Sequence, residues 1–100
     1  MSARVRHIVL VRWVDGAGED DKQAVRDAIA GFPEQVPGIV ALRIGDDFGG
    51  TPNSFDLAAV IDFADRESWV AYKNHPAHRA YIEGPGRRAV GTLAVLQHEW

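Results

Sequence analysis

The pattern of apolar and polar positions predicts four strands and several helices along this chain. Residues 5–14 are rich in valine, isoleucine and leucine and predict a first strand. Residues 19–32 begin with acidic side chains and then carry apolar ones at three- and four-residue spacing, which indicates an amphipathic helix. Three later stretches predict further strands, at residues 39–44, 55–63 and 90–98.

Two helical segments are expected between the third and fourth strands. Asp65 is a favourable N-cap for the first of them, which runs to about residue 73. His75-Pro76 interrupts this helix because proline cannot continue it, and Pro76 then suits the first position of a second short helix. Gly84-Pro85-Gly86 is expected to end that second helix.

The resulting order of elements, β-α-β-β-α(α)-β, is that of a ferredoxin-like split βαβ motif. Its second and third strands are joined by a loop of moderate length and are therefore expected to be antiparallel neighbours. The pattern predicts one α+β domain over residues 1–100, with a four-stranded antiparallel sheet and all helices on one face.

Both faces of this sheet are expected to be apolar, so the helices can cover only one of them. The uncovered face is expected to carry His7, Val9, Val11, Leu57 and Ala59. An apolar face of that size indicates an interface or a ligand cavity. Two copies packed through it would form a homodimer, a dimeric α/β barrel.

Composition narrows the function classes. The formal charge is −3 and the arginines are scattered, which argues against a dedicated nucleic-acid binder. The chain contains no cysteine, so disulfides and thiolate metal sites are excluded. The apolar run after the basic N-terminus covers only residues 8–11, so no signal peptide or membrane span is expected and a cytoplasmic location is the default.

Tyr72, His75 and His78 follow one another at three-residue spacing around the expected helix break. A histidine can act as general acid or base near neutral pH, and a neighbouring tyrosine can donate a hydrogen bond to a developing oxyanion. A structural interpretation stands beside this one: His75 caps the following helix, His78 binds a backbone group and Tyr72 packs. Because His75 directly precedes Pro76, we assign it mainly to structure and take His78 as the better catalytic candidate.

The remaining patterns point to no cofactor or metal. His7 on an apolar strand is either a satisfied core residue or a second polar group inside a cavity. His75 and His78, at three-residue spacing across a proline, fit a metal-binding pair poorly, so no metal is expected. The chain has neither a phosphate-binding glycine loop with its lysine nor a Gly-x-Ser-x-Gly nucleophile turn.

Several segments, in order along nearly the whole chain, resemble the stress-responsive dimeric α/β-barrel (Dabb) family. The Tyr-x-x-His-Pro-x-His element is the most specific of them. The resemblance implies a ferredoxin-like protomer and a homodimer that closes through its sheets. The segments that carry it are residues 6–13, 36–39, 55–58, 62–65 and 72–78.

Members of this family differ in function, and most have no assigned activity. One branch holds plant polyketide cyclases of the olivetolic acid cyclase type, which close a ring by an intramolecular aldol reaction. There the tyrosine and the second histidine of the element are catalytic, which implies that Tyr72 and His78 perform cofactor-free acid–base chemistry on a small apolar carbonyl compound. The residues expected to contact it are His7, Val9, Val11, Ile29, Leu57, Ala59 and His75.

Two alternatives remain open at this stage. The protein could be a non-catalytic stress or ligand-binding dimer, in which the same residues only hold the structure together. It could also be a cofactor-independent monooxygenase acting on an activated aromatic compound. An open cavity that reaches both Tyr72 and His78 would favour the lyase or cyclase reading, whereas an interior filled by Trp13 and Ile61 would favour the non-catalytic one.

Overall fold

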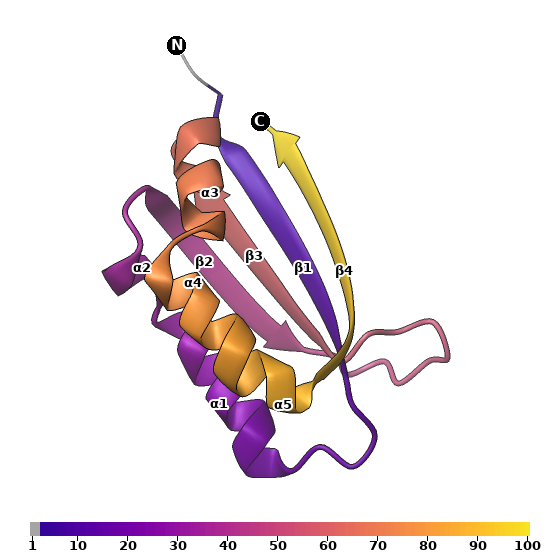
Figure 1. The fold of residues 1–100 in the computed structure, drawn as a ribbon. Helices are drawn as coiled ribbons and strands as arrows, with labels where there is room; N and C mark the ends of the chain where they lie inside the picture. Colours follow the sequence, from indigo (N-terminus) through magenta and orange to yellow (C-terminus); the bar gives the residue numbers. More distant parts are fainter. Residues whose placement is uncertain (1–2) are drawn as a thin grey trace.

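The computed structural model describes residues 3–100, which form a four-stranded antiparallel sheet with helices on one face (Figure 1). The order of strands across the sheet is β2-β3-β1-β4, and every neighbouring pair is antiparallel. This arrangement confirms the ferredoxin-like α+β fold. The strands are β1 (Val5–Trp13), β2 (Ile39–Asp46), β3 (Leu57–Phe63) and β4 (Val90–Glu99).

The helices occupy the two crossovers and lie over β2, β3 and β1, while β4 stands clear of them at the edge of the sheet (Figure 1). The first crossover contains a short second helix that the sequence pattern did not separate from the first. The helical elements are α1 (Glu19–Ala30), α2 (Phe32–Gln35), α3 (Arg66–Lys73), α4 (Pro76–Tyr81), the π-helical turn η1 (Ile82–Gly86) and α5 (Arg87–Ala89).

Side-chain caps fix the beginnings of α3 and α4, as the sequence predicts. The Asp65 carboxylate accepts hydrogen bonds from the backbone N–H and the hydroxyl of Ser68, each at 2.8 Å. The His75 ring nitrogen Nδ1 accepts a hydrogen bond from the Ala77 N–H at 3.0 Å. Each cap satisfies an amide that the first helical turn leaves without a partner.

The expected end of the second short helix at Gly84-Pro85-Gly86 is wrong. The chain instead widens into the η1 turn and continues as α5 up to β4. Gly86 permits this path, because a Cβ atom there would lie 3.0 Å from the Tyr81 carbonyl oxygen. Wide helical turns of this kind redirect the side chains that follow, and here the next residue is Arg87.

The expected assignment of the two sheet faces is also wrong. The five residues placed on the uncovered face lie beneath the helices, where Val11 is 0% and Leu57 2% exposed. The open face instead carries Ile8, Leu10 and their neighbours at even positions of β1. The reason is charge: Arg6 and Arg12 of β1 and Asp62 of β3 lie on the open face, whereas the face of these two strands that the helices cover carries no Asp, Glu, Lys or Arg. The five residues that the sequence pattern assigned to the wrong face are His7, Val9, Val11, Leu57 and Ala59.

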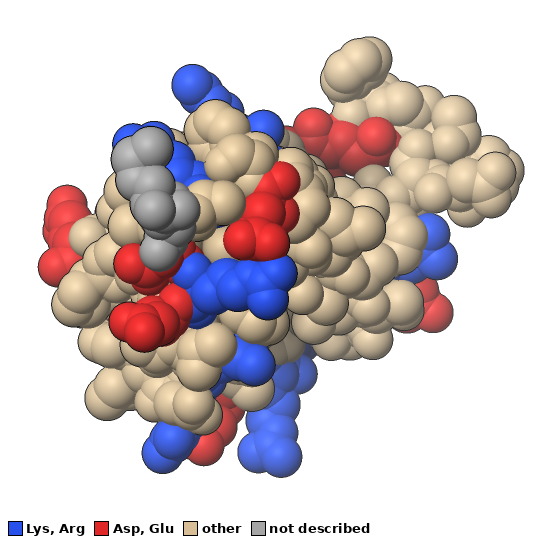
Figure 2. Space-filling model, turned by 90° about the horizontal axis from the view of Figure 1, so that it is seen from above, with Lys and Arg blue, Asp and Glu red and all other residues tan. Residues whose placement is uncertain are grey.

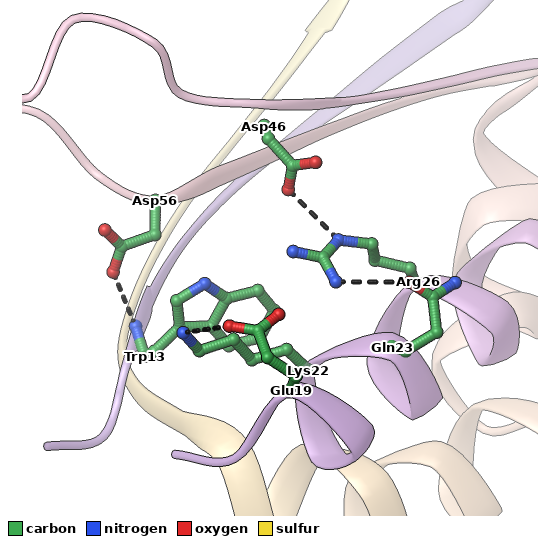
Figure 3. A network of polar contacts seen from close by, with 7 residues as sticks. All are labelled: Trp13, Glu19, Lys22, Gln23, Arg26, Asp46 and Asp56. Carbon is green, nitrogen blue, oxygen red and sulfur yellow. Dashed lines mark hydrogen bonds and ion pairs between the residues drawn. The ribbon is translucent and has the colours of Figure 1, made fainter. Parts of the chain in front are cut away.

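A polar network ties α1 to one end of the sheet (Figure 3). The Arg26 guanidinium donates from Nε to Asp46 at 3.0 Å and from a terminal nitrogen to Gln23 at 3.3 Å. The guanidinium carbon also lies 5.6 Å from the Trp13 ring centroid, and the backbone N–H of Trp13 donates to the Asp56 carboxylate at 2.8 Å. Trp13 is therefore held at this end of the sheet and does not fill the interior.

The loop between β2 and β3 projects from the body of the molecule (Figures 1 and 2). On the surface seen in Figure 2, basic and acidic side chains intermingle rather than gather in patches of one sign. Across residues 3–100 the structure has no helix that is long and apolar enough to cross a membrane.

Candidate active site between the sheet and the helices

A cavity of about 480 Å³ lies between the sheet and the helices, and both Tyr72 and His78 line it. Most of its wall is apolar, and the lining residues come from β1, β3, β4, the five helices α1 to α5 and the turn η1. Its contributors among the described residues include Val9, Ile29, Phe32, Ala59, Ile61, Ile82, Val90, Leu93 and Val95.

The break at His75-Pro76 brings Tyr72 and His78 together. Tyr72 lies in the last turn of α3 and His78 in the first turn of α4, and their ring centroids are 4.4 Å apart. Phe32 of α2 packs edge-on against Tyr72, with 5.6 Å between ring centroids, and lies 6.2 Å from the His78 ring. The pair is thus held by packing from a third element.

A backbone hydrogen bond fixes the protonation pattern of His78. Its Nδ1 lies 3.2 Å from the Lys73 carbonyl oxygen, which can only accept, so Nδ1 carries the proton and donates. Burial lowers the pKa of His78 from its ordinary value, and the bond to Lys73 opposes this only in part. His78 is consequently a neutral imidazole near pH 7, with Nε2 as the nitrogen that can accept a proton.

Tyr72 stays protonated under the same conditions. Its side chain is buried, and this burial, followed by the nearby Tyr81, raises the pKa of the Tyr72 phenol. A phenol that keeps its proton can donate a hydrogen bond but cannot serve as a base near neutral pH.

His7 is a third polar group in the cavity wall. Its Nδ1 donates to the Gln97 amide oxygen at 2.7 Å, and its ring centroid lies 5.7 Å from that of Tyr72. Burial lowers the pKa of His7; the Gln97 bond opposes the shift and the nearby His78 adds to it. Of the two readings of His7 that the sequence left open, the structure combines both: it is buried and bonded, and it faces the cavity.

The structure separates the expected substrate contacts into two groups. His7, Val9, Ile29 and Ala59 line the cavity together with Tyr72 and His78. Val11, Leu57 and His75 do not: the first two are core residues, and His75 serves as the N-cap of α4.

Several cavity residues escaped the sequence reasoning. Gln97 could have been found, because β4 lies beside β1 in a ferredoxin-like sheet and pairs Gln97 with His7. Trp69 lies three residues before Tyr72 and four before Lys73 on α3, so a helical projection would have placed Trp69 beside both. Arg87 depends on the η1 turn, for which the sequence gives no comparable signal.

No metal centre is evident in the described part of the chain, where no three His, Asp or Glu side chains cluster in a way that could hold an ion. The polar groups of the cavity are instead the ring nitrogens of two histidines, two phenols, an indole, an amide and the basic side chains at its rim.

Solved structures with the same fold include proteins of very different sequence. A dimeric ferredoxin-like protein of unknown function from Thermobifida fusca is 27% identical, with 100% of this chain and 93% of that chain covered and a TM-score of 0.86. A hydroxynitrile lyase from Passiflora edulis is 15% identical, with 100% and 95% covered and a TM-score of 0.87. A dimeric ferredoxin-like protein of unknown function from Bacteroides fragilis is 22% identical, with 97% and 96% covered and a TM-score of 0.80.

A search of curated proteins finds no match to this sequence. The comparison with protein families does find one: the family described as the stress responsive A/B barrel domain matches residues 5–95. The match includes three complete strands, all the helices and the Tyr72–His78 element, and it ends within β4. The chain therefore belongs to the stress-responsive A/B barrel domain (Dabb) family.

Proposed function

We propose that this protein binds a small apolar carbonyl compound between its sheet and helices and catalyses cofactor-free proton transfer on it. The observation that carries the proposal is the pairing of two groups in one apolar cavity. His78 is a neutral base whose Nδ1 is already engaged by the Lys73 carbonyl, and the protonated Tyr72 lies 4.4 Å away between ring centroids.

The cavity suits a ligand of this kind. Its volume of about 480 Å³ falls within the range of about 300–1,000 Å³ that small-molecule sites occupy. Its wall is mostly aliphatic and aromatic, so the body of the ligand is apolar, while the few polar groups fix its orientation.

The proposed step moves one proton and one electron pair. The His78 Nε2 removes a proton from the carbon next to the carbonyl, and the electrons of the broken C–H bond form the enolate. The Tyr72 hydroxyl donates a hydrogen bond to the oxygen on which the negative charge develops. The enolate can then add to a second carbonyl in an aldol closure, after which the alkoxide takes the proton from His78, or it can take that proton back at carbon. His7, held by Gln97, orients the substrate.

We infer that two copies pair through the open sheet face. Ile8, Leu10 and Val60 lie there, and Leu96 on the edge strand is 55% exposed in the single chain. Surfaces of this character are typically interfaces. Two solved proteins with the same fold, from Thermobifida fusca and Bacteroides fragilis, are described as dimeric, which supports this pairing.

Exchange of carbon-bound hydrogen tests the proposed step without knowledge of the natural substrate. The probe is 1-phenylpropan-2-one in D₂O, and proton NMR follows the loss of the signals next to the carbonyl. We expect the protein to accelerate this exchange and His78→Asn to reduce the acceleration about 100-fold. Asparagine keeps an N–H that can bind the Lys73 carbonyl, so the variant removes the base more than the local structure.

His75→Asn is the matched control, because asparagine retains the N-cap of α4 and His75 does not line the cavity. We expect this variant to exchange at the rate of the unmodified protein. Equal exchange rates for His78→Asn and the unmodified protein, or no acceleration over buffer by either, would contradict the proposal and favour a non-catalytic ligand-binding dimer.

A further inference from the structure

The charged residues that line the cavity are all basic. The chain has 14 acidic residues and 11 Lys and Arg, yet none of the cavity-lining residues that the structure describes is Asp or Glu. Two of them, Lys73 and Arg87, carry a permanent positive charge, and both are exposed at the surface. The cavity therefore has a positive rim and an apolar interior.

These two cations are not neutralised by the protein. Within residues 3–100 no carboxylate lies within ion-pair distance of Lys73 or Arg87, whereas Arg6, Arg26, Arg66 and Arg88 each have such a partner. The Lys73 ammonium instead lies over the Trp69 ring, 4.3 Å from its centroid. This contact holds the ammonium beside a cavity residue and leaves its hydrogen-bond capacity available.

A second, independent observation also calls for an acceptor from outside the chain. The Trp69 indole nitrogen is buried, lines the cavity through its residue and has no hydrogen-bond partner among the described residues. An indole N–H can only donate, and a buried donor without a partner is destabilising. Since no acidic side chain faces the cavity, a ligand oxygen is the natural acceptor.

We propose that the ligand of this cavity is an apolar carboxylic acid, bound as its anion. Its carboxylate lies at the rim between the charges of Lys73 and Arg87 and accepts the Trp69 indole hydrogen bond, while its apolar body occupies the interior. The inference deepens the proposed function, on which it rests for the carbonyl group, by naming an acidic substrate. The preference for an anionic over an uncharged ligand depends only on Trp69, Lys73 and Arg87, and not on the proposed proton transfer.

Calorimetric titration with a matched pair of compounds tests this selection. The probes are 4-phenylbutanoate and the uncharged 4-phenylbutanamide, which share shape and apolar area, at pH about 7.5 and low ionic strength. We expect the acid to bind about tenfold more tightly than the amide, because only the acid forms charge-assisted hydrogen bonds at the rim. In the Lys73→Met/Arg87→Met double variant the ratio should fall below about threefold.

Arg79→Met is the control for the loss of a nearby positive charge, since Arg79 is an exposed residue of α4 that does not line the cavity. The preference for the acid should survive in this variant. Equal affinity for acid and amide, no detectable binding of the acid, or a loss in Arg79→Met as large as in the double variant would each overturn the inference.

The NMR signals of the tryptophan indole N–H protons give a readout in the unmodified protein, without any substitution. The chain has three tryptophans, and Trp13 and Trp100 do not line the cavity. On addition of 4-phenylbutanoate the Trp69 indole proton should shift as its hydrogen bond forms, while the other two signals stay in place. An unmoved Trp69 signal at saturation would overturn the inference. If the acid binds as expected but no carbon-bound hydrogen exchanges, the proposed proton transfer is wrong and the acidic ligand stands. If hydrogen exchanges but acid and amide bind equally well, the proton transfer stands and the acidic ligand is wrong.

Discussion

The Lys73 carbonyl oxygen and the His78 Nδ1 lie 3.2 Å apart, so the last residue of α3 orients a side chain of α4 across the helix break. The break does two things at once. His75 turns its own ring nitrogen back to cap α4, and the exposed turn places the His78 ring against Tyr72. Two histidines three residues apart thus have opposite roles. The His75 ring accepts a hydrogen bond from a backbone N–H, whereas the His78 ring donates one to a backbone carbonyl and keeps Nε2 as an acceptor.

The lowered histidine pKa values predict a pH-dependent stability. Burial lowers the pKa of both His7 and His78, so both stay neutral in the folded protein at a pH where they take up protons in the unfolded chain. Folding stability is then fully present above the unfolded pKa of about 6.5 and falls as the pH drops through that value. Urea denaturation at a fixed protein concentration, between about pH 8 and about pH 5, measures the effect.

Titration of Asp62 and Asp65 does not contribute to the change in stability over this pH range. Asp62, bonded to Arg6, and Asp65, bonded to Ser68, have pKa values lowered below 3.8, so their contribution disappears only at more acidic pH. The His7→Asn/His78→Asn double variant should show a much flatter profile between about pH 7 and about pH 5. A profile as steep as that of the unmodified protein would show that other groups cause the loss.

Removal of the α3 cap should destabilise the protein by a modest amount. The Asp65 carboxylate satisfies the Ser68 amide at 2.8 Å, and Asp65→Ala leaves this donor without its partner. We expect a loss of about 1 kcal/mol in the free energy of unfolding, whereas Asp65→Asn should retain most of it because asparagine caps nearly as well. Chemical denaturation of the two variants side by side distinguishes them; equal losses would contradict the assigned role.

Gly86→Ala tests the close approach that permits the η1 turn. A Cβ atom at this position would meet the Tyr81 carbonyl oxygen at 3.0 Å and the Tyr81 ring at 3.4 Å. Because backbone cannot easily move aside, we expect destabilisation of about 1–3 kcal/mol and a change in the cavity wall to which Tyr81 belongs. Gly84→Ala is the matched control, since nothing lies within 4 Å of a Cβ there. Thermal unfolding of both variants should rank them in that order, and an equal loss would be contrary to this account.

A charge on the open sheet face should prevent pairing of two copies. Leu96→Asp places a carboxylate at an exposed position of β4 and should convert the dimer to a monomer, which native mass spectrometry detects. Val70→Asp is the control, because Val70 is similarly exposed but belongs to α3 on the helix side of the sheet. A monomeric unmodified protein, or a dimer that survives Leu96→Asp unchanged, would contradict pairing through this face.

Local patterns predicted much of the fold because they record local physics. Asp65 and Pro76 marked the beginnings of α3 and α4, since capping and proline geometry depend on a few neighbouring residues. The alternation in β1 and β3 correctly grouped the residues that share a face. Which face the helices cover was misjudged, although Arg6, Arg12 and Asp62 mark the open one; apolar content alone could not decide because both faces are apolar in the middle.

The candidate site was harder to predict because its wall comes from eight helices and strands and from the irregular turn η1. Tyr72 and His78 stood out through their residue types and spacing, and the structure brings them together. Gln97 required the pairing of the first and last strands, and Arg87 required η1, whose wide turn depends on contact between Gly86 and Tyr81. Such dependence on distant parts of the chain leaves little trace in local sequence.

The state of the His78 ring is the most direct test of this account, which holds that a neutral imidazole offers Nε2 to the substrate. Two-bond proton–nitrogen correlation spectra of the ¹⁵N-labelled protein report which ring nitrogen carries the proton and the pH at which the ring titrates. We expect the proton on Nδ1 and a titration midpoint below the ordinary value of about 6.5. A proton on Nε2, or a midpoint above that value, would contradict the assignment of His78 as the base.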